Sequence, residues 1–203
     1  MNGMSDLHLD WCGYDAAKYA CENWHYSECV PSGKTLKIGV WEDDSFIGVI
    51  IYSRGANNHI AEPFGLDQTE VCELTRVALT DHNAPVTQML SISRKLLTKK
   101  CPGLRLIVSY ADPQQDHHGG IYQADNWTYI GTSIAQREVL IDGVEYHKRT
   151  VYAKYGTASV ERLNERHPSK KFERGPKRFK YKYLYVLDDG IQPKVKAMSE
   201  PYP

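Results

Sequence analysis

VCELTRVALTDHNAPVTQMLSISRKLLTKK, residues 71–100, is the stretch that decides the fold. Its first part, Val71–Leu79, is an apolar run that predicts a buried strand, and the loop TDHN follows it. The remainder predicts a helix, with Pro85 in the first turn, where its missing N–H is tolerated. Apolar side chains recur on one face of that helix, namely Met89, Ile92, Leu96 and Leu97.

Downstream, the chain continues as strand, short helix and strand. LRLIVSYAD (104–112) predicts a strand that stops at Pro113, GGIYQADNW (119–127) a short amphipathic helix, and TYIGTS (128–133) a further strand. This order of elements resembles the core of GNAT-type acyltransferases. The resemblance implies an α/β (α+β) fold with a central mixed, twisted sheet flanked by helices. Because a helix joins the first two strands, we expect them to be parallel neighbours that splay at their carboxyl ends.

The loop between the first strand and the long helix bears on the ligand. Backbone N–H groups at a helix N-terminus attract anions, and GNATs place there a glycine-rich run that wraps a pyrophosphate. In this chain the run is TDHNAP (80–85), which contains no glycine. We therefore expect the architecture without the usual grip on coenzyme A.

The flanking sequence predicts the remaining elements. Upstream, DLHLDWC (6–12) predicts a strand, Tyr14–Trp24 a helix, and TLKIGVW with SFIGVIIYS a hairpin that turns at EDD. Downstream, QREVLI and VEYHKR flank Asp142-Gly143, a pair typical of tight hairpin turns. ASVERLNER predicts a short helix and YLYVL (183–187) a last strand.

Composition limits the class of protein. The chain has 203 residues with 25 Lys and Arg against 25 Asp and Glu, so no global charge favours nucleic acid. Its five cysteines are odd in number and lack C-x-x-C spacing, which favours free thiols in a reducing compartment. No apolar run reaches the ~18 residues of a membrane span, and no signal peptide opens the sequence. We expect a cytoplasmic protein without a membrane partner.

We predict one GNAT-like domain over residues 1–190 and a polar tail over 191–203. Within the domain, PSKKFERGPKRFKYK (168–182) has seven cations against Glu173, a net charge of +6. Such a basic segment with interleaved aromatic residues favours binding to a DNA backbone, and a solvated tail or strand edge is the alternative. The expected DNA-binding residues are Lys170, Lys171, Arg174, Lys177, Arg178, Lys180 and Lys182.

Two clusters of side chains are candidates for chemistry. WHYS (24–27) offers an imidazole, a phenol and a hydroxyl after a helix, where His25 can act as a base; a plain helix terminus is the alternative. SYADP (109–113) ends a buried strand at its carboxyl edge, where open α/β sheets bind ligands. There Asp112 precedes a proline on a stiff backbone, and its alternative is a turn or helix cap.

Two further features have weaker support. Tyr122 lies where GNATs commonly use a tyrosine as general acid or ligand contact, and a core aromatic paired with Trp127 is the alternative. The triplet Asp116-His117-His118 looks metal-binding, but adjacent histidines on a loop rarely form a site without further ligands such as His82 or His59. We expect no metal site.

Several separated blocks, in order, resemble the Mom family of bacteriophage DNA-modification proteins. They are NWHYSECVPSGK, CELTRVAL, SYAD, HHGGIYQADNWTYIGTS, and YAKYGTASVERL with the basic, aromatic strand after it, and they cover about residues 23–187. The resemblance implies a GNAT-related transferase that places a carbamoylmethyl (acetamido) group on the N6 amine of adenine in double-stranded DNA. Phage DNA would thereby be protected from host restriction enzymes.

The resemblance also implies roles for residues. The catalytic residues would be His25, Tyr26, Ser109, Asp112 and Tyr122, with substrate contacts from Trp24, Ser27 and Tyr110. Donor contacts would come from Val77, Leu79, Asn83 and Asn126. Because the transferred group carries an amide nitrogen, a glycine-derived or aminoacyl donor suits it better than acetyl-coenzyme A.

The expected mechanism follows from the weak nucleophilicity of the N6 amine. Asp112 would accept a hydrogen bond from N6–H, and the adenine would be flipped out of the duplex onto an aromatic ring. His25 would pass a proton, and Tyr122 would donate to the leaving group or the donor carbonyl. We therefore expect His25, Tyr26, Asp112 and Tyr122 to lie together at the splay between the two parallel strands.

Two other functions fit parts of the sequence. An ordinary GNAT that acetylates a small amine or a protein would explain the core but not the basic segment. A non-enzymatic DNA-binding protein would explain the basic segment but not a convergence of His25, Asp112 and Tyr122.

Overall fold

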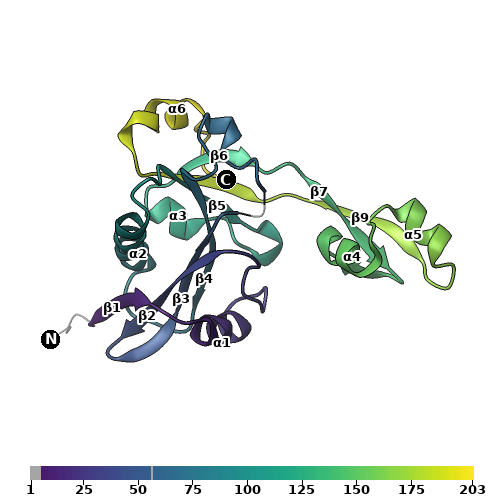
Figure 1. Ribbon diagram of the computed structural model, residues 1–203, viewed down its shortest axis with the longest axis horizontal. Helices are drawn as coiled ribbons and strands as arrows, with labels where there is room; N and C mark the ends of the chain where they lie inside the picture. Colours follow the sequence, from purple (N-terminus) through teal and green to yellow (C-terminus); the bar gives the residue numbers. More distant parts are fainter. Residues whose placement is uncertain (1–5, 56) are drawn as a thin grey trace.

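A computed structural model describes residues 6–55 and 57–203 (Figure 1). Its largest element is a seven-stranded sheet with the strand order β1-β2-β3-β4-β5-β10-β6. The strands are β1 (Leu7–Trp11), β2 (Thr35–Glu42), β3 (Ser45–Ser53), β4 (Val71–Leu79), β5 (Leu106–Ala111), β6 (Thr128–Thr132) and β10 (Tyr181–Val186). Parallel and antiparallel pairs occur in the same sheet, so the predicted mixed architecture is confirmed.

The pairing of β4 with β5 opens the sheet at one end. The two strands are parallel neighbours, as predicted, from the pair Val71 and Leu106 to the pair Leu74 and Ser109. Beyond that level both strands continue without pairing to each other. At the same level Thr75 is an extra residue in β4 against β3, which bends the strand. The carboxyl ends of β4 and β5 therefore separate, as expected from the sequence.

Helices cover both faces of this sheet (Figure 1). On one face lies α1 (Tyr14–Trp24), the helix predicted at those residues; its small side chains pack closely on β3 and β4. On the other face lie α2 (Val86–Lys100) and α3 (Gly120–Ala124). Successive side chains of β3 point to opposite faces of the sheet. Val49 and Ile51 therefore pack with α1, whereas Ile50 and Tyr52 pack with α2.

The C-terminal residues pack on the sheet and differ from the polar tail expected at 191–203. A short 3₁₀ turn (Asp189–Ile191) leads into α6 (Gln192–Ala197), whose Val195 is buried beside Phe64. Phe64 belongs to another short 3₁₀ turn (Glu62–Phe64) in the long loop before β4. Near the end of the chain, the Tyr202 hydroxyl donates a hydrogen bond of 2.7 Å to the Trp127 carbonyl.

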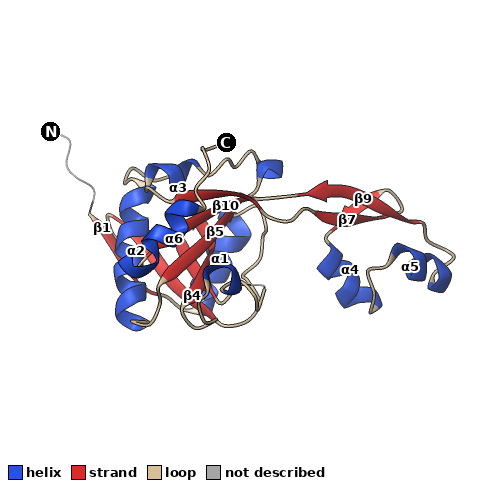
Figure 2. Cartoon of the chain, turned by 90° about the horizontal axis from the view of Figure 1, so that it is seen from above, coloured by secondary structure: helices blue, strands red, loops and turns tan. Residues whose placement is uncertain are grey.

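Residues 134–180 form a projecting arm (Figures 1 and 2). The arm has its own three-stranded sheet, in the order β8-β7-β9, and two helices packed on it. Its elements are β7 (Gln136–Ile141), β8 (Val144–Tyr146), α4 (Lys148–Tyr155), α5 (Val160–Arg166) and β9 (Phe172–Arg178). We call the other described residues the body.

The arm agrees with the sequence prediction in part. The Asp142-Gly143 turn has positive φ at both residues (52° and 85°), as the hairpin prediction requires. The second strand, however, ends at Tyr146 and not at Arg149, because His147 caps a new helix by accepting a hydrogen bond from the Arg149 N–H (3.1 Å). Across residues 6–55 and 57–203, none of the helices is long and apolar enough to cross a membrane.

Candidate active site

The end of α1 brings His25 to the opening between β4 and β5. His25 ends the helix with an extended backbone and is half-buried. Its Nδ1 accepts a hydrogen bond from the Ser27 backbone N–H (3.1 Å) and lies 2.9 Å from the Ser27 hydroxyl. Because a backbone N–H can only donate, Nδ1 is the unprotonated nitrogen and Nε2 carries the proton in the neutral ring. The free edge of His25 is therefore a hydrogen-bond donor.

Aromatic rings extend this site. The His25 ring stacks on the exposed Tyr26 ring with centroids 4.4 Å apart, and Tyr26 in turn meets the edge of His117 at 5.6 Å. His117 belongs to the loop that follows β5. The rings thus join the end of α1 to the loop at the end of the neighbouring parallel strand.

Asp112 lies at the carboxyl end of β5 and is held by two partners. One carboxylate oxygen accepts a hydrogen bond from the Gln114 backbone N–H (3.1 Å), so the expected capping interaction is present. The other oxygen lies 3.1 Å from the Lys180 ammonium, and the Asp112 side chain is only 14% exposed. Lys180 is the last residue of the arm, at the end that joins the body (the root of the arm). The arm therefore contributes directly to this site.

The environment lowers the pKa of His25 from its ordinary 6.5 to about 4. Burial is the largest cause, because a charged ring loses hydration, and the positive charges of Arg76, His117 and Lys180 add to it. His25 is therefore neutral near pH 7. A neutral ring with its proton on Nε2 can donate a hydrogen bond without carrying a charge.

Ser109 and Tyr122 meet beneath the opening. The Ser109 hydroxyl lies 2.8 Å from both the Leu74 carbonyl oxygen and the Tyr122 hydroxyl. Because the carbonyl can only accept, the Ser109 proton goes to Leu74, and the Tyr122 hydroxyl donates to Ser109. Burial raises the pKa of Tyr122 to about 12, so the phenol stays protonated at neutral pH. Tyr26 is near enough to add to this shift, which places the two phenols in one neighbourhood.

Other expected substrate contacts have structural roles. The Trp24 ring packs against Tyr19 and Phe46, at centroid distances of 5.3 and 5.9 Å, and belongs to the core under α1. Tyr110 is half-buried, and burial followed by the charge of Glu73 raises its pKa to about 12. Ser27 orients His25, as described above.

The expected donor contacts are spread along one side of the sheet. Val77 and Leu79 are partly buried against the core beneath α2. Asn83 follows them in the loop before α2, and Asn126 lies in the turn after α3 with a positive φ of 58°. Among these four residues, Asn83 has the most informative contact.

A buried glutamate occupies the N-terminal side of α2. The carboxylate of Glu42, at the end of β2, accepts hydrogen bonds from the backbone N–H groups of Ala84 (2.6 Å) and Asn83 (2.9 Å). Glu42 is 6% exposed. These N–H groups lie in the loop just before α2, and the carboxylate beside them repels a second anion there.

Most cations of the basic segment are paired with carboxylates. Lys182 differs from the rest because it lies on β10 of the body, where its ammonium is 5.0 Å from the Phe64 ring centroid and burial lowers its pKa. The observed pairs are Lys170 with Asp142, Lys171 with Glu173, Arg174 with Glu161, Arg178 with Glu145, and Lys180 with Asp112. The segment is therefore divided between two sheets and carries less free charge than its sequence indicates.

Three residues of the site were not expected from the sequence in these roles. Lys180 was expected to bind DNA but pairs with Asp112; Arg76 and Glu42 were not singled out. No local pattern marks them, because each acts on a residue far away in the chain. The histidines considered for metal binding form no group of three or more possible ligands within the described chain.

These features define a class of protein. The parallel, splayed β4–β5 pair within a mixed sheet is the fold of GNAT acetyltransferases. A probable GNAT-family acetyltransferase from Chromobacterium violaceum matches 95% of this chain and 87% of its own, with a TM-score of 0.50 and 12% identity. A probable acetyltransferase from Staphylococcus epidermidis matches 90% of this chain and 100% of its own, with a TM-score of 0.50 and 7% identity.

The chain belongs to the Mom protein family, whose model matches residues 6–203. One relative is the "Methylcarbamoylase mom" of Escherichia phage Mu, which is 25% identical over 155 residues. The match covers 74% of this chain and 64% of the relative, so the chain spans less than two thirds of that protein's length.

Proposed function

We propose that the protein is a transferase that places a carbamoylmethyl group on the N6 amine of adenine in DNA. The Mom family and the name of the phage Mu relative support DNA modification, and the fold supports group transfer to an amine. The observation that carries the proposal is a chain of contacts around His25: Lys180, the partner of Asp112, helps to lower the pKa of His25, and Tyr26, which stacks on His25, adds to the raised pKa of Tyr122. None of His25, Asp112 and Tyr122 is adjacent to another in sequence.

In this proposal Asp112 receives the amine. The N6 lone pair is delocalised into the adenine ring, so a carboxylate that accepts a hydrogen bond from N6–H makes the nitrogen more nucleophilic. The contacts from Gln114 and Lys180 support this role, because they fix both oxygens in place.

His25 serves as a donor and Tyr26 as a stacking surface. The proton on Nε2 suits His25 to donate to a carbonyl oxygen of the transferred group, in place of the proton-passing role expected from sequence. Tyr26 presents an exposed ring, 44% accessible, beside that donor. An adenine flipped out of the duplex can stack on this ring.

Tyr122 supplies a protonated phenol. Because its one proton goes to Ser109, the Tyr122 oxygen is suited to accept a hydrogen bond from a polar group of the donor, in place of the proton donation expected from sequence. In the net reaction the N6–H bond and the bond between the donor's CH2 carbon and its leaving group break, an N6–CH2 bond forms, and the leaving group departs with the N6 proton.

The donor in this proposal carries no pyrophosphate at the α2 loop. Glu42 already accepts hydrogen bonds from the N–H groups there, which argues against coenzyme A and against an ordinary acetyltransferase. A glycine-derived or aminoacyl donor supplies the amide nitrogen of the product without needing that loop. Calorimetric titration with coenzyme A checks this part: we expect no heat of binding, and micromolar affinity for coenzyme A would contradict it.

Nucleoside analysis tests the function itself. DNA from cells expressing the wild-type chain is digested to nucleosides and analysed by mass spectrometry for adenosine carrying the added group. Tyr122→Phe is the matched variant, since it removes one hydroxyl and keeps the buried ring. We expect modified adenine with the wild type and a reduced yield with Tyr122→Phe. Unmodified adenine with the wild type, in cells that supply the donor to a known family member, would reject the proposal.

A further inference from the structure

Charge is divided unequally between the arm and the body. The arm (134–180) contains twelve Lys and Arg against six Asp and Glu, a net charge of +6. The rest of the chain contains thirteen against nineteen, a net charge of −6. The zero net charge of the whole chain therefore conceals a basic arm on an acidic body.

The helix α4 presents exposed cations on the arm. Its residues KRTVYAKY include Lys148, Arg149 and Lys154 and no carboxylate. Of its side chains Val151 is buried in the arm, whereas Tyr152 is 63% exposed. Only one residue of this helix packs into the arm. Its exposed cationic and aromatic side chains are available to bind a partner molecule.

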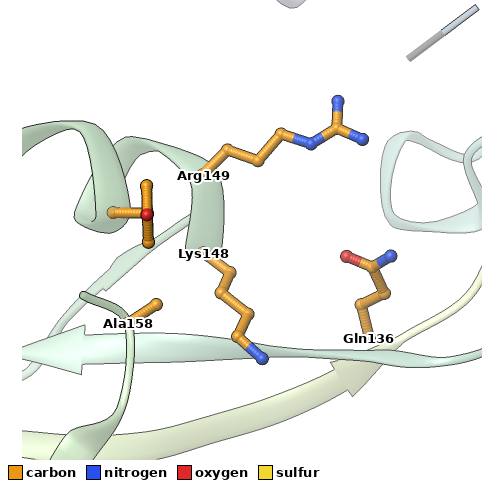
Figure 3. Close-up of a pocket in the computed structure, with 5 residues that line it drawn as sticks. Gln136, Lys148, Arg149 and Ala158 are labelled. Carbon is orange, nitrogen blue, oxygen red and sulfur yellow. The ribbon is translucent and has the colours of Figure 1, made fainter. Parts of the chain in front are cut away.

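An open hollow lies beside this helix. It has a volume of about 270 Å³ and is lined by Gln136, Lys148, Arg149, Tyr152 and Ala158. In Figure 3, Lys148 and Arg149 extend from α4 and Gln136 rises from the strand below them, so cationic and amide groups border the same space. Phosphate oxygens are acceptors for all three side chains.

The root of the arm joins this surface to the candidate active site. Lys180 pairs with Asp112, and Arg178 donates a hydrogen bond to the Gln114 side chain in the loop that follows Asp112. Ser133, where the chain leaves the body, is paired with Lys180, where it returns. The Ser133 N–H donates to the Lys180 carbonyl (2.8 Å), and the Ser133 hydroxyl accepts from the Lys180 N–H (2.9 Å). Of the two arm helices, α4 lies nearer to the body in both views (Figures 1 and 2).

We propose that α4 and the hollow beside it hold duplex DNA through its phosphates and so present a base to the site in the body. This inference rests on the proposed function, and it moves the DNA surface from the 168–182 segment to α4. Seven residues of β9, at about 3.3 Å each, extend the arm by roughly 23 Å, which exceeds the ~12 Å width of a major groove. The arm is therefore long enough to follow a duplex beyond one groove.

Charge reversal on α4 tests the proposal. Lys148→Glu combined with Arg149→Glu is compared with Lys95→Glu combined with Lys99→Glu, which makes the same charge change on exposed positions of α2. Binding of a labelled duplex is measured from ~0.05 to ~0.2 M salt. We expect the α4 variant to bind about tenfold more weakly at ~0.1 M salt and to lose about 2 from the slope of log affinity against log salt. Equal affinities and slopes for the two variants would overturn the proposal.

Two additional measurements keep the result interpretable. The milder Lys148→Gln and Arg149→Gln pair is included, and circular dichroism confirms that each variant is folded; a folded Gln variant with unchanged salt slope counts against α4. Nucleoside analysis of wild-type samples runs in parallel, so a wild type that binds through α4 but modifies no adenine rejects the proposed function alone. Loss of self-association in the α4 variant, with DNA affinity unchanged, would assign α4 to a second copy of the chain.

Discussion

The body buries three hydrophobic clusters around a seven-stranded sheet, whereas the arm is held by one cluster of five buried side chains between its three-stranded sheet and its two helices. The body has a net charge of −6 and the arm +6. The candidate catalytic residues lie in the well-packed region, where their geometry is fixed by several elements. The net positive charge lies on the arm, the region with the smaller core.

Under the two proposals, this difference predicts that catalysis and DNA binding can be changed separately. The chain passes between the two regions twice, after residues 133 and 180. A few polar contacts also join them, chiefly those of Lys180 and Arg178 with the loop after β5. Changes that remove a group from the site should leave the phosphate contacts of the arm intact. Changes on α4 should weaken binding without altering the groups around Asp112.

The largest expected effect is that of Asp112→Asn in the body. Asn keeps one carbonyl acceptor but cannot take up a proton or stabilise positive charge on N6, so adenine modification should fall by about 10²–10⁴-fold. Duplex binding should stay within about twofold of wild type, because no phosphate contact is removed. Modified nucleosides and duplex affinity are measured on the same preparation. Modification near the wild-type yield would leave Asp112 only an orienting role.

Glu42→Ala should destabilise the body. The change removes a buried charged acceptor and leaves the N–H groups of Asn83 and Ala84 without it, which costs about 2–4 kcal/mol of unfolding free energy. Glu22→Ala, on an exposed helical pair with Lys18, should cost less than about 0.5 kcal/mol. Urea unfolding measures both. Equal losses would mean that Glu42 does not hold the loop before α2 in solution.

The pKa of His25 gives the body a pH-dependent stability. Its folded-state value of about 4 lies below the ordinary 6.5, so between these values the unfolded chain binds more protons than the folded one. The contribution of His25 to the unfolding free energy is complete above pH 6.5 and is lost as the pH falls toward 4. Unfolding free energies at pH 7 and 4.5 should therefore differ less for His25→Gln than for wild type. A His25→Gln variant with unchanged pH dependence would refute the shift.

The smallest expected effect concerns the paired cations of the arm. Lys170→Ala combined with Arg174→Ala removes two exposed ion pairs, with Asp142 and Glu161, so each lost positive charge leaves a carboxylate behind. Stability should change by less than about 1 kcal/mol. Duplex affinity should fall by less than about threefold, well below the effect on α4. A larger loss than that of the α4 variant would return the DNA surface to the 168–182 segment.

Local patterns in the sequence predicted much of the body. The alanine-rich face over Tyr14–Trp24 predicted α1 at its observed bounds, and the apolar run at Val71–Leu79 predicted β4. The parallel β4–β5 pair followed from the helix between the two strands. These features depend on residues close together in the chain, which is why a sequence pattern is sufficient for them.

The arm and the polar contacts of the site were less predictable. β9 reads FERGPKR, where Gly175 and Pro176 interrupt the alternation of a strand, and α4 buries only Val151, so it lacks an apolar face. The contacts of Glu42 with Ala84 and of Lys180 with Asp112 join residues 42 and 68 positions apart. Such contacts exist only once the sheet has formed, so no local pattern indicates them.

The central claim is that the body is catalytic and the arm holds DNA. Its most direct test compares one variant in each region. Asp112→Asn and the Lys148→Glu, Arg149→Glu pair are assayed side by side for duplex affinity and for modified adenine at low and raised salt. The account predicts that Asp112→Asn binds as wild type and modifies almost nothing. It predicts that the α4 variant modifies adenine at low salt and loses both binding and modification as salt rises. If each variant loses binding and modification together at every salt concentration, the two regions act as one site and the account is wrong.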